Sequence, residues 1–116
     1  MSVTWCYTEV VRHLSVWEPV AILFEDEANE RRALLRLKRA GVDLTRIEPF
    51  RCPTNRSWIR DSGGTFVRRQ RQKTVRSEVA LVDWRFNGWA KYNDWSYDNR
   101  LPERIANERD LRRFVA

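Results

Sequence analysis

The sequence predicts an α/β fold, because runs typical of buried strands alternate with segments of helical periodicity. Residues 20–24 (VAILF) form a short continuous apolar run, as in a strand buried on both faces. Residues 29–40 carry apolar side chains at helical spacing, and residues 42–47 alternate between apolar and polar. Together they predict a β-α-β unit with parallel strands and a right-handed crossover. A length of 116 residues leaves room for about one domain, residues 1–116.

Two helices of this first half have recognisable ends. Residues 4–17 predict a helix that stops before Pro19. Its expected apolar stripe consists of Val10, Leu14 and Trp17. Asp26 is placed to cap the next helix, and Gly41 to end it. The stripe of that second helix consists of Ala33, Leu34, Leu37 and Ala40.

The second half predicts a hairpin followed by a helix. Residues 49–53, bounded by two prolines, are expected to form a loop. Residues 65–67 and 78–86 then predict strands, joined by an Arg- and Gln-rich loop. Residues 87–100 lack periodicity and are expected to be loop. A last helix is predicted to begin with Pro102, and its apolar side carries Ile105 and Leu111.

The charge balance is basic. Lys and Arg number 22 against 16 Asp and Glu, which gives a net charge of +6 and a pI near 10.0. One dense basic patch consists of Arg68, Arg69, Arg71, Lys73 and Arg76. Together with six Trp, it suits nucleic-acid binding. However, arginines are spread along the whole chain, which favours a solvated loop and keeps nucleic-acid binding as the alternative.

Several classes of function are disfavoured by what the sequence lacks. Only Cys6, Cys52 and His13 could bind zinc through sulfur or imidazole, and their spacing does not match a zinc motif. Cys-His catalysis would require folding to bring His13 to one of the cysteines. No apolar run approaches the ~20 residues of a membrane span, and the first residues do not resemble a signal peptide. We therefore expect a cytoplasmic protein without a membrane partner.

The stretch from Trp58 to Gly64 is the first candidate site. Trp58 precedes Asp61 by three residues, and Gly63 and Gly64 follow. A carboxylate can accept two N–H bonds from a guanidinium, while an indole face stacks on the same planar cation. Glycines allow the backbone to turn sharply and approach a ligand. The alternative is a capping Asp61 beside a core Trp58.

The second candidate segment follows residues 78–82. In an alternating strand, Asp83, Arg85 and Asn87 would lie on one side and Trp84 and Phe86 on the other. A polar row at a strand end could orient a substrate. The alternative is the solvated face of an edge strand.

Both segments resemble the agmatine deiminase family, which includes the bacterial type of peptidylarginine deiminase. The family patterns Asn-Asp-Ser-Trp-x-Arg-Asp-x-Gly-Pro-Thr-Phe and Val-Asp-Trp-x-Phe-Asn-x-Trp-Gly stand here at residues 55–66 (NRSWIRDSGGTF) and 82–89 (VDWRFNGW). Weaker likeness covers residues 17–20, 41–43 and the chain from Arg100 onward. The resemblance therefore extends over nearly the whole sequence.

The resemblance implies the pentein α/β propeller, of which this length would supply about one module and the start of a second. It implies hydrolysis of a guanidinium to a ureido group with release of ammonia, on agmatine or on arginine residues, without a metal or organic cofactor. Asp61 then corresponds to a guanidinium-binding aspartate and Trp58 to the aromatic residue on the substrate. Arg85 and Asn87 correspond to a strand near the substrate's tail.

The same resemblance predicts a truncated domain that is inactive alone. The family's nucleophilic cysteine and catalytic histidine belong to motifs that this sequence does not contain. Arg56 replaces an acidic residue and is expected to repel a cationic substrate. Gly64 replaces proline, and Ala90-Lys91 replaces Gly-Gly-Lys. A partial propeller would also expose sheet edges through which the chain could self-associate.

Overall fold

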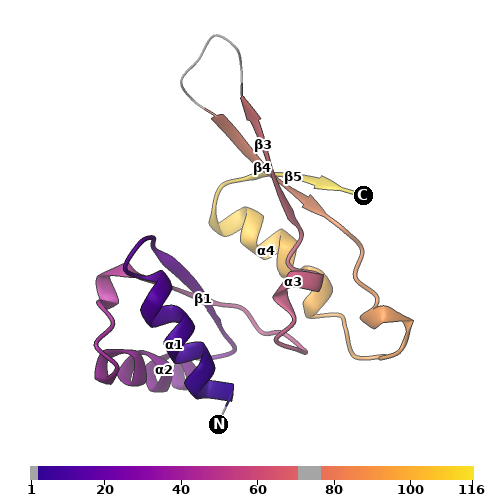
Figure 1. The fold of residues 1–116 in the computed structure, drawn as a ribbon. Helices are drawn as coiled ribbons and strands as arrows, with labels where there is room; N and C mark the ends of the chain where they lie inside the picture. Colours follow the sequence, from indigo (N-terminus) through magenta and orange to yellow (C-terminus); the bar gives the residue numbers. More distant parts are fainter. Residues whose placement is uncertain (1–2, 71–76) are drawn as a thin grey trace. The chain divides into compact units, whose positions relative to one another are not determined.

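The computed structural model describes residues 3–70 and 77–116, and the chain divides into two compact units, Met1–Pro53 and Thr54–Ala116 (Figure 1). Both units combine helices with strands, which confirms the predicted α/β class. Within the described ranges the sheets have two and three strands, and neither closes on itself. None of the helices described is long and apolar enough to cross a membrane.

The first unit contains the predicted β-α-β arrangement. Its elements are α1 (Val3–Leu14), β1 (Val20–Phe24), α2 (Glu27–Arg39), a 3-10 turn (Leu44–Arg46) and β2 (Ile47–Arg51). Strands β1 and β2 pair in parallel, with Val20 opposite Ile47. The core of this unit consists of Val11, Leu37, Val42 and Ile47.

Helix α2 begins and ends as the sequence predicts. The Asp26 carboxylate accepts a hydrogen bond from the backbone N–H of Asn29 at 2.7 Å. At the other end Gly41 has a φ of +81°. The N–H of Val42 then bonds to the carbonyl of Leu37 at 3.0 Å. This pattern satisfies carbonyls at the helix end and brings Val42 into the core beside Leu37.

The strand predicted at residues 42–47 is wrong in position. Asp43 accepts a hydrogen bond from the N–H of Thr45 at 3.0 Å and caps the short 3-10 turn, so alternation there does not mark a strand. The strand follows instead as β2 and includes Pro49, which was expected in a loop. A proline is compatible with β2 because both strands of a two-stranded sheet are edge strands.

The predicted inner face of α1 is also wrong. Val10, Leu14 and Trp17 are 52%, 42% and 85% exposed. The helix instead buries Thr8 and Val11, so its inner face is rotated from the predicted stripe. The prediction that β1 is buried on both faces fails as well, since only Phe24 of β1 is fully buried and Ala21 is exposed.

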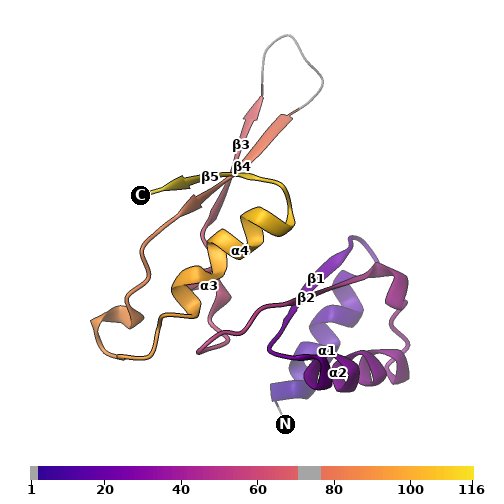
Figure 2. The ribbon, with the colours of Figure 1, turned by 180° about the vertical axis from the view of Figure 1, so that it is seen from behind.

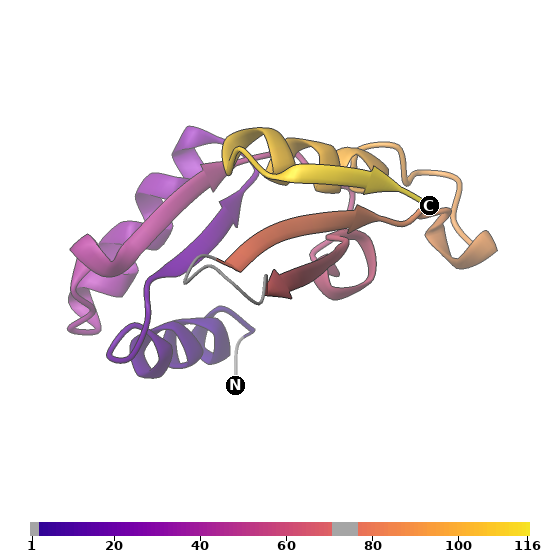
Figure 3. The same ribbon diagram turned by 90° about the horizontal axis from the view of Figure 1, so that it is seen from above.

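The second unit is built on a three-stranded sheet of order β3-β4-β5 (Figure 3). Its elements are α3 (Ile59–Ser62), β3 (Thr65–Gln70), β4 (Ser77–Asp83), 3-10 turns at Gly88–Ala90 and Asp98–Arg100, α4 (Leu101–Glu108) and β5 (Arg112–Val115). Strands β3 and β4 are antiparallel, whereas β4 and β5 are parallel. Helix α4 packs against β4 (Figure 2), and Leu101 and Ala106 of the helix and Leu81 of the strand are buried.

The predicted hairpin and last helix are confirmed with different bounds. Strand β3 continues to Gln70, β4 ends at Asp83, and β5 was not predicted. Leu111, expected on the apolar side of α4, follows that helix in the turn to β5. Of the predicted basic loop, residues 71–76 lie outside the described ranges.

Candidate substrate-binding site

Trp58 and Asp61 lie together on the turn that begins α3. The backbone N–H groups of Asp61 and Ser62 donate to the carbonyl of Trp58 at 3.1 and 3.3 Å, which fixes the turn. Trp58 is 61% exposed, so the alternative of a core tryptophan is wrong. Asp61 is exposed, and within the described ranges its side chain forms no hydrogen bond or ion pair. A solvent-exposed indole and a carboxylate without a described partner thus occupy the same turn.

The glycines after α3 are required by close backbone approach. A Cβ at Gly63 would lie 2.5 Å from the carbonyl oxygen of Ile59. Gly64 has a φ of +78°, and a Cβ there would lie 2.8 Å from the carbonyl oxygen of Val82 on β4. Proline has a fixed φ near −65° and cannot adopt this conformation. The turn therefore needs the glycine that stands where the resembling family has proline.

The second candidate segment is not a strand with a polar face. Strand β4 ends at Asp83, and the chain from Trp84 to Asn87 has no regular structure. Asp83 is buried and accepts a hydrogen bond from Nη1 of Arg113 at 3.0 Å. Arg113 also pairs with Glu103 of α4 at 3.1 Å. Asp83 thus connects β4 to β5 and α4.

Arg85 and Asn87 lie on the loop after β4. The side-chain oxygen Oδ1 of Asn87 accepts a hydrogen bond from the N–H of Ala90 at 3.2 Å and caps the following 3-10 turn. Arg85 is exposed and forms no ion pair with any described residue. Among residues 3–70 and 77–116, no hydrogen bond or ion pair joins either side chain to Trp58 or Asp61.

A reciprocal bracket, not predicted from the sequence, holds the turn that carries Trp58. The Asp98 carboxylate is almost fully buried and accepts hydrogen bonds from the backbone of Asn55 at 2.7 Å and Arg56 at 3.1 Å. The Asn55 side chain in turn accepts from the N–H groups of Tyr97 at 2.9 Å and Asp98 at 3.3 Å. Asp98 lies in a stretch without periodicity, so no sequence signal indicated this contact.

The positive charge of Arg56 is compensated within this unit. Its Nη2 donates to the Asp94 carboxylate and its Nη1 to the Asp94 carbonyl. The hydrogen bond from Arg56 lowers the pKa of Asp94. A second carboxylate, that of Asp98, lies 3.9 Å from Nη1. The repulsion of a cationic substrate predicted for Arg56 is therefore opposed by two neighbouring carboxylates.

The 3-10 turn after Asn87 has left-handed backbone geometry. Gly88, Trp89 and Ala90 have φ angles of +63°, +57° and +56°. The Trp89 ring meets Phe86 edge to face at 5.0 Å between centroids, and Tyr92 at 6.1 Å. Trp89 and Ala90 thus both lie in a region of φ that costs free energy, and the ring contacts of Trp89 stabilise its position.

The described residues bring together no cysteine and histidine for nucleophilic catalysis. Cys6 and His13 both lie on α1, seven positions apart, which corresponds to about 10 Å along a helix. Cys52 is buried, and its Sγ lies 3.7 Å from the carbonyl oxygen of Pro53. Within the described ranges, no group of three His, Cys, Asp or Glu side chains could hold a metal ion.

Comparison with known proteins identifies relatives of the whole chain. The family of Porphyromonas-type peptidyl-arginine deiminases matches residues 1–116. The agmatine deiminase of Ectopseudomonas mendocina is 27% identical over 113 residues, which cover 93% of this chain and 28% of that protein. The chain therefore spans less than a third of the length of this relative.

Solved structures show the same fold. The agmatine deiminase of Enterococcus faecalis superposes with a TM-score of 0.70 at 19% identity, over 95% of this chain and 28% of that one. The C. jejuni agmatine deiminase with substrate bound has a TM-score of 0.70 at 20% identity, over 97% and 30%. By its match over the full sequence, the chain belongs to the family of Porphyromonas-type peptidyl-arginine deiminases and is related to the agmatine deiminases.

Proposed function

We propose that this chain supplies part of the guanidinium-binding site of a deiminase. The observation that carries the proposal is the turn at α3, where the carboxylate of Asp61, unpaired among the described residues, lies three residues from the exposed indole of Trp58. The reaction would be hydrolysis of agmatine to N-carbamoylputrescine and ammonia, a step toward putrescine, or the equivalent conversion of an arginine residue.

Each residue has a distinct role in this proposal. The Asp61 carboxylate accepts two N–H bonds from the guanidinium, and the Trp58 indole stacks on its planar face. Arg85 and Asn87, on the loop after β4, would contact the remainder of the substrate. Because Arg85 is a cation, its contribution would favour a carbonyl or carboxylate there over the terminal amine of agmatine.

Catalysis needs groups that the described residues do not assemble. A thiolate must attack the guanidinium carbon, an amine must leave as ammonia, and water must then release the ureido product. With Cys52 buried and His13 exposed on α1, we propose that this chain binds without hydrolysing. Ammonia release from agmatine by the purified chain would contradict this statement.

The binding proposal is tested by calorimetric titration of the full chain with agmatine and with a peptide containing arginine. Charged hydrogen bonds and stacking from half a site support a Kd of about 1 mM. Asp61→Asn should weaken binding at least about tenfold, because the amide offers one acceptor oxygen and no charge. Asp110→Asn, which changes another exposed aspartate of the same unit, is the matched control. Equal affinity of the Asp61 variant and the control would refute the proposed role.

We also propose self-association through open sheet edges. In the order β3-β4-β5, strands β3 and β5 are the outer strands, and β1 and β2 each have one free edge within their pair. Such edges offer backbone groups to another strand. Sedimentation of the purified chain as a monomer at all concentrations would contradict this proposal.

A further inference from the structure

The side chain of Arg56 lies among three groups that together suit a planar cation. Its Cζ lies 4.3 Å from the ring centroid of Tyr92. Asp94 accepts hydrogen bonds from both terminal nitrogens, through its carboxylate and its carbonyl oxygen. The buried Asp98 adds a second carboxylate, whose oxygen lies 3.9 Å from Nη1 of Arg56. Only 18% of the Arg56 side chain remains exposed.

We propose that Tyr92, Asp94 and Asp98 form a guanidinium-binding cage that the chain fills with its own Arg56. The aromatic face supports the plane of the cation, and the acceptors lie at its edge, as recognition of a guanidinium requires. The cage is separate from Asp61, which contributes to none of these contacts. The cage therefore suits the same class of ligand as the proposed substrate site but is formed by different residues of the unit.

The geometry favours a guanidinium over an ammonium ion. Lys91 lies over the same ring, with its Nζ at 5.4 Å, yet the described hydrogen bonds to Asp94 come from the guanidinium of Arg56. A planar fork can donate to a carboxylate and a carbonyl at once while it stacks, whereas an ammonium group acts as a compact point charge. The cage should therefore discriminate between the two types of cation.

Filling the cage has two consequences for the neighbouring turn. Arg56 precedes Trp58 by two residues, so its side chain anchors the turn that carries Trp58 to residues 92–98. It also satisfies the negative charges of Asp94 and Asp98, which would otherwise attract free cations. Arg56 is thus a positioning residue, and its charge is directed into the cage.

The first test is chemical rescue of Arg56→Ala in the full chain. The substitution should lower the melting temperature by roughly 4–8 °C, and methylguanidinium at millimolar concentration should restore part of this loss. Methylammonium at the same ionic strength should not. Arg104→Ala, which removes an exposed arginine of α4, is the matched control and should respond to neither ion. The double variant Arg56→Ala/Asp94→Asn should lose the rescue.

Rescue by methylammonium to the same extent, or equal rescue of the double variant, would overturn the cage. If Arg56→Ala does not fold, Arg56→Lys provides the second variant. Its ammonium should fill the cage poorly, so its melting temperature should also fall. An unchanged melting temperature of Arg56→Lys would refute the requirement for a guanidinium.

Titration with agmatine separates this inference from the proposed function. Arg56→Ala should gain a binding event that persists when Asp61→Asn is added, since the cage does not include Asp61. Loss of agmatine binding in Asp61→Asn alone, with the added event intact in the double variant, supports both sites. An added event that disappears with Asp61→Asn would refute the cage and leave the substrate site in place.

Discussion

Ala90 is one of three non-glycine residues with a left-handed backbone among those the structure describes. Its φ of +56° costs an L-residue with a Cβ about 1–2 kcal/mol. We predict that Ala90→Gly raises the free energy of unfolding by about 0.5–1 kcal/mol, because the relief exceeds the added entropy of the unfolded chain. Chemical denaturation measures the change. The resembling family has glycine at this point, which agrees with the strain seen here.

Ala106→Gly is the matched control for this substitution. Ala106 lies in α4 with right-handed geometry and is 3% exposed, so glycine should destabilise the chain by about 1 kcal/mol or more. If Ala90→Gly and Ala106→Gly destabilise the chain equally, the left-handed φ of Ala90 carries no strain that glycine relieves.

The lowered pKa of Asp94 predicts that the stability of the chain depends on pH. Its hydrogen bond from Arg56 lowers the pKa below its ordinary value of 3.8. A carboxyl whose folded pKa is depressed contributes stability that is fully present above the unfolded pKa and is lost as pH falls through the folded pKa. Melting temperatures measured downward from pH 5 should therefore fall less steeply for Asp94→Asn than for the unmodified chain. Asp110→Asn should leave the slope unchanged, and an equal effect of both substitutions would contradict the assignment.

Among the elements, α1 offers a direct test of its observed orientation. Val11 is 8% exposed and belongs to the core, whereas its neighbour Val10 is 52% exposed. Val11→Ala should lower the free energy of unfolding by about 1–3 kcal/mol. Val10→Ala should change it by less than about 0.5 kcal/mol. A larger loss of unfolding free energy in Val10→Ala than in Val11→Ala, measured by denaturation, would instead support the stripe predicted from periodicity.

The helices and strands show which sequence signals are sufficient to predict an element and its buried face. Helix α2 was predictable because its cap, its stripe and its terminal glycine all agree. Helix α1 has apolar residues on more than one face, so periodicity alone did not identify the face that meets the core. Strand β2 was misplaced because Asp43 starts a 3-10 turn that imitates strand alternation. Strand β5 was missed because its first two residues are arginines and three of its four residues, including Phe114, are exposed.

The candidate site also has parts that the sequence could predict and parts that it could not. Trp58 and Asp61 could be predicted to share one turn because they are three residues apart, and the family resemblance singled them out as candidates. The bracket between Asn55 and Asp98, and the contact of Arg56 with Asp94, join residues about 40 positions apart. Such contacts depend on the path of the whole unit, and a single sequence carries no local signal for them.

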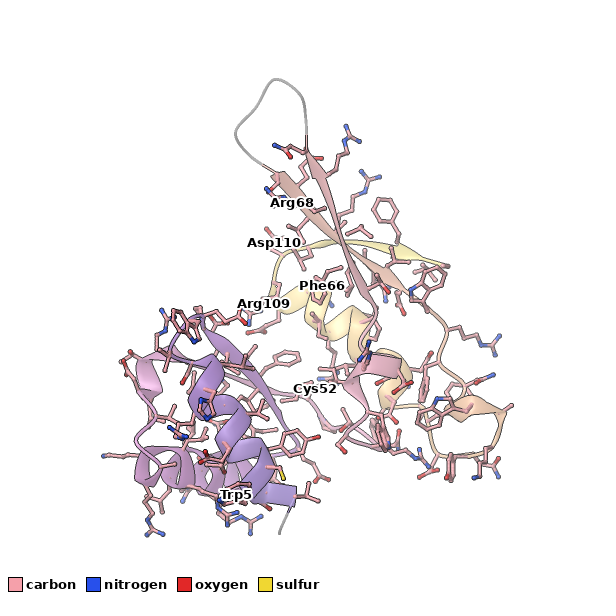
Figure 4. All side chains as sticks on the ribbon, in the orientation of Figure 1. Trp5, Cys52, Phe66, Arg68, Arg109 and Asp110 are labelled. Carbon is pink, nitrogen blue, oxygen red and sulfur yellow. The ribbon has the colours of Figure 1, made fainter. Side chains whose placement is uncertain are left out.

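At the scale of the whole molecule, the net charge of +6 bears on the choice of ligand. Part of the basic patch is described: Arg68 and Arg69 are exposed on β3, and Figure 4 labels Arg68 on this hairpin. The other members of the patch, Arg71, Lys73 and Arg76, lie outside the described ranges. Nucleic-acid binding and guanidinium binding make opposite demands on this charge, since one ligand is a polyanion and the other a cation.

Salt dependence distinguishes the two ligands. Agmatine bound by one carboxylate and a ring should change in affinity by less than about threefold between 50 and 200 mM salt, because local attraction and long-range repulsion are screened together. A nucleic acid held by about five cationic side chains should weaken by roughly 500-fold over the same range. We predict the shallow dependence for agmatine and no tight binding of a DNA duplex at 200 mM salt, measured by titration of the full chain. A steep salt dependence of DNA binding that becomes shallower in Arg68→Ala/Arg69→Ala would instead make Arg68 and Arg69 of β3 part of the functional surface, because only phosphate contacts release condensed counterions.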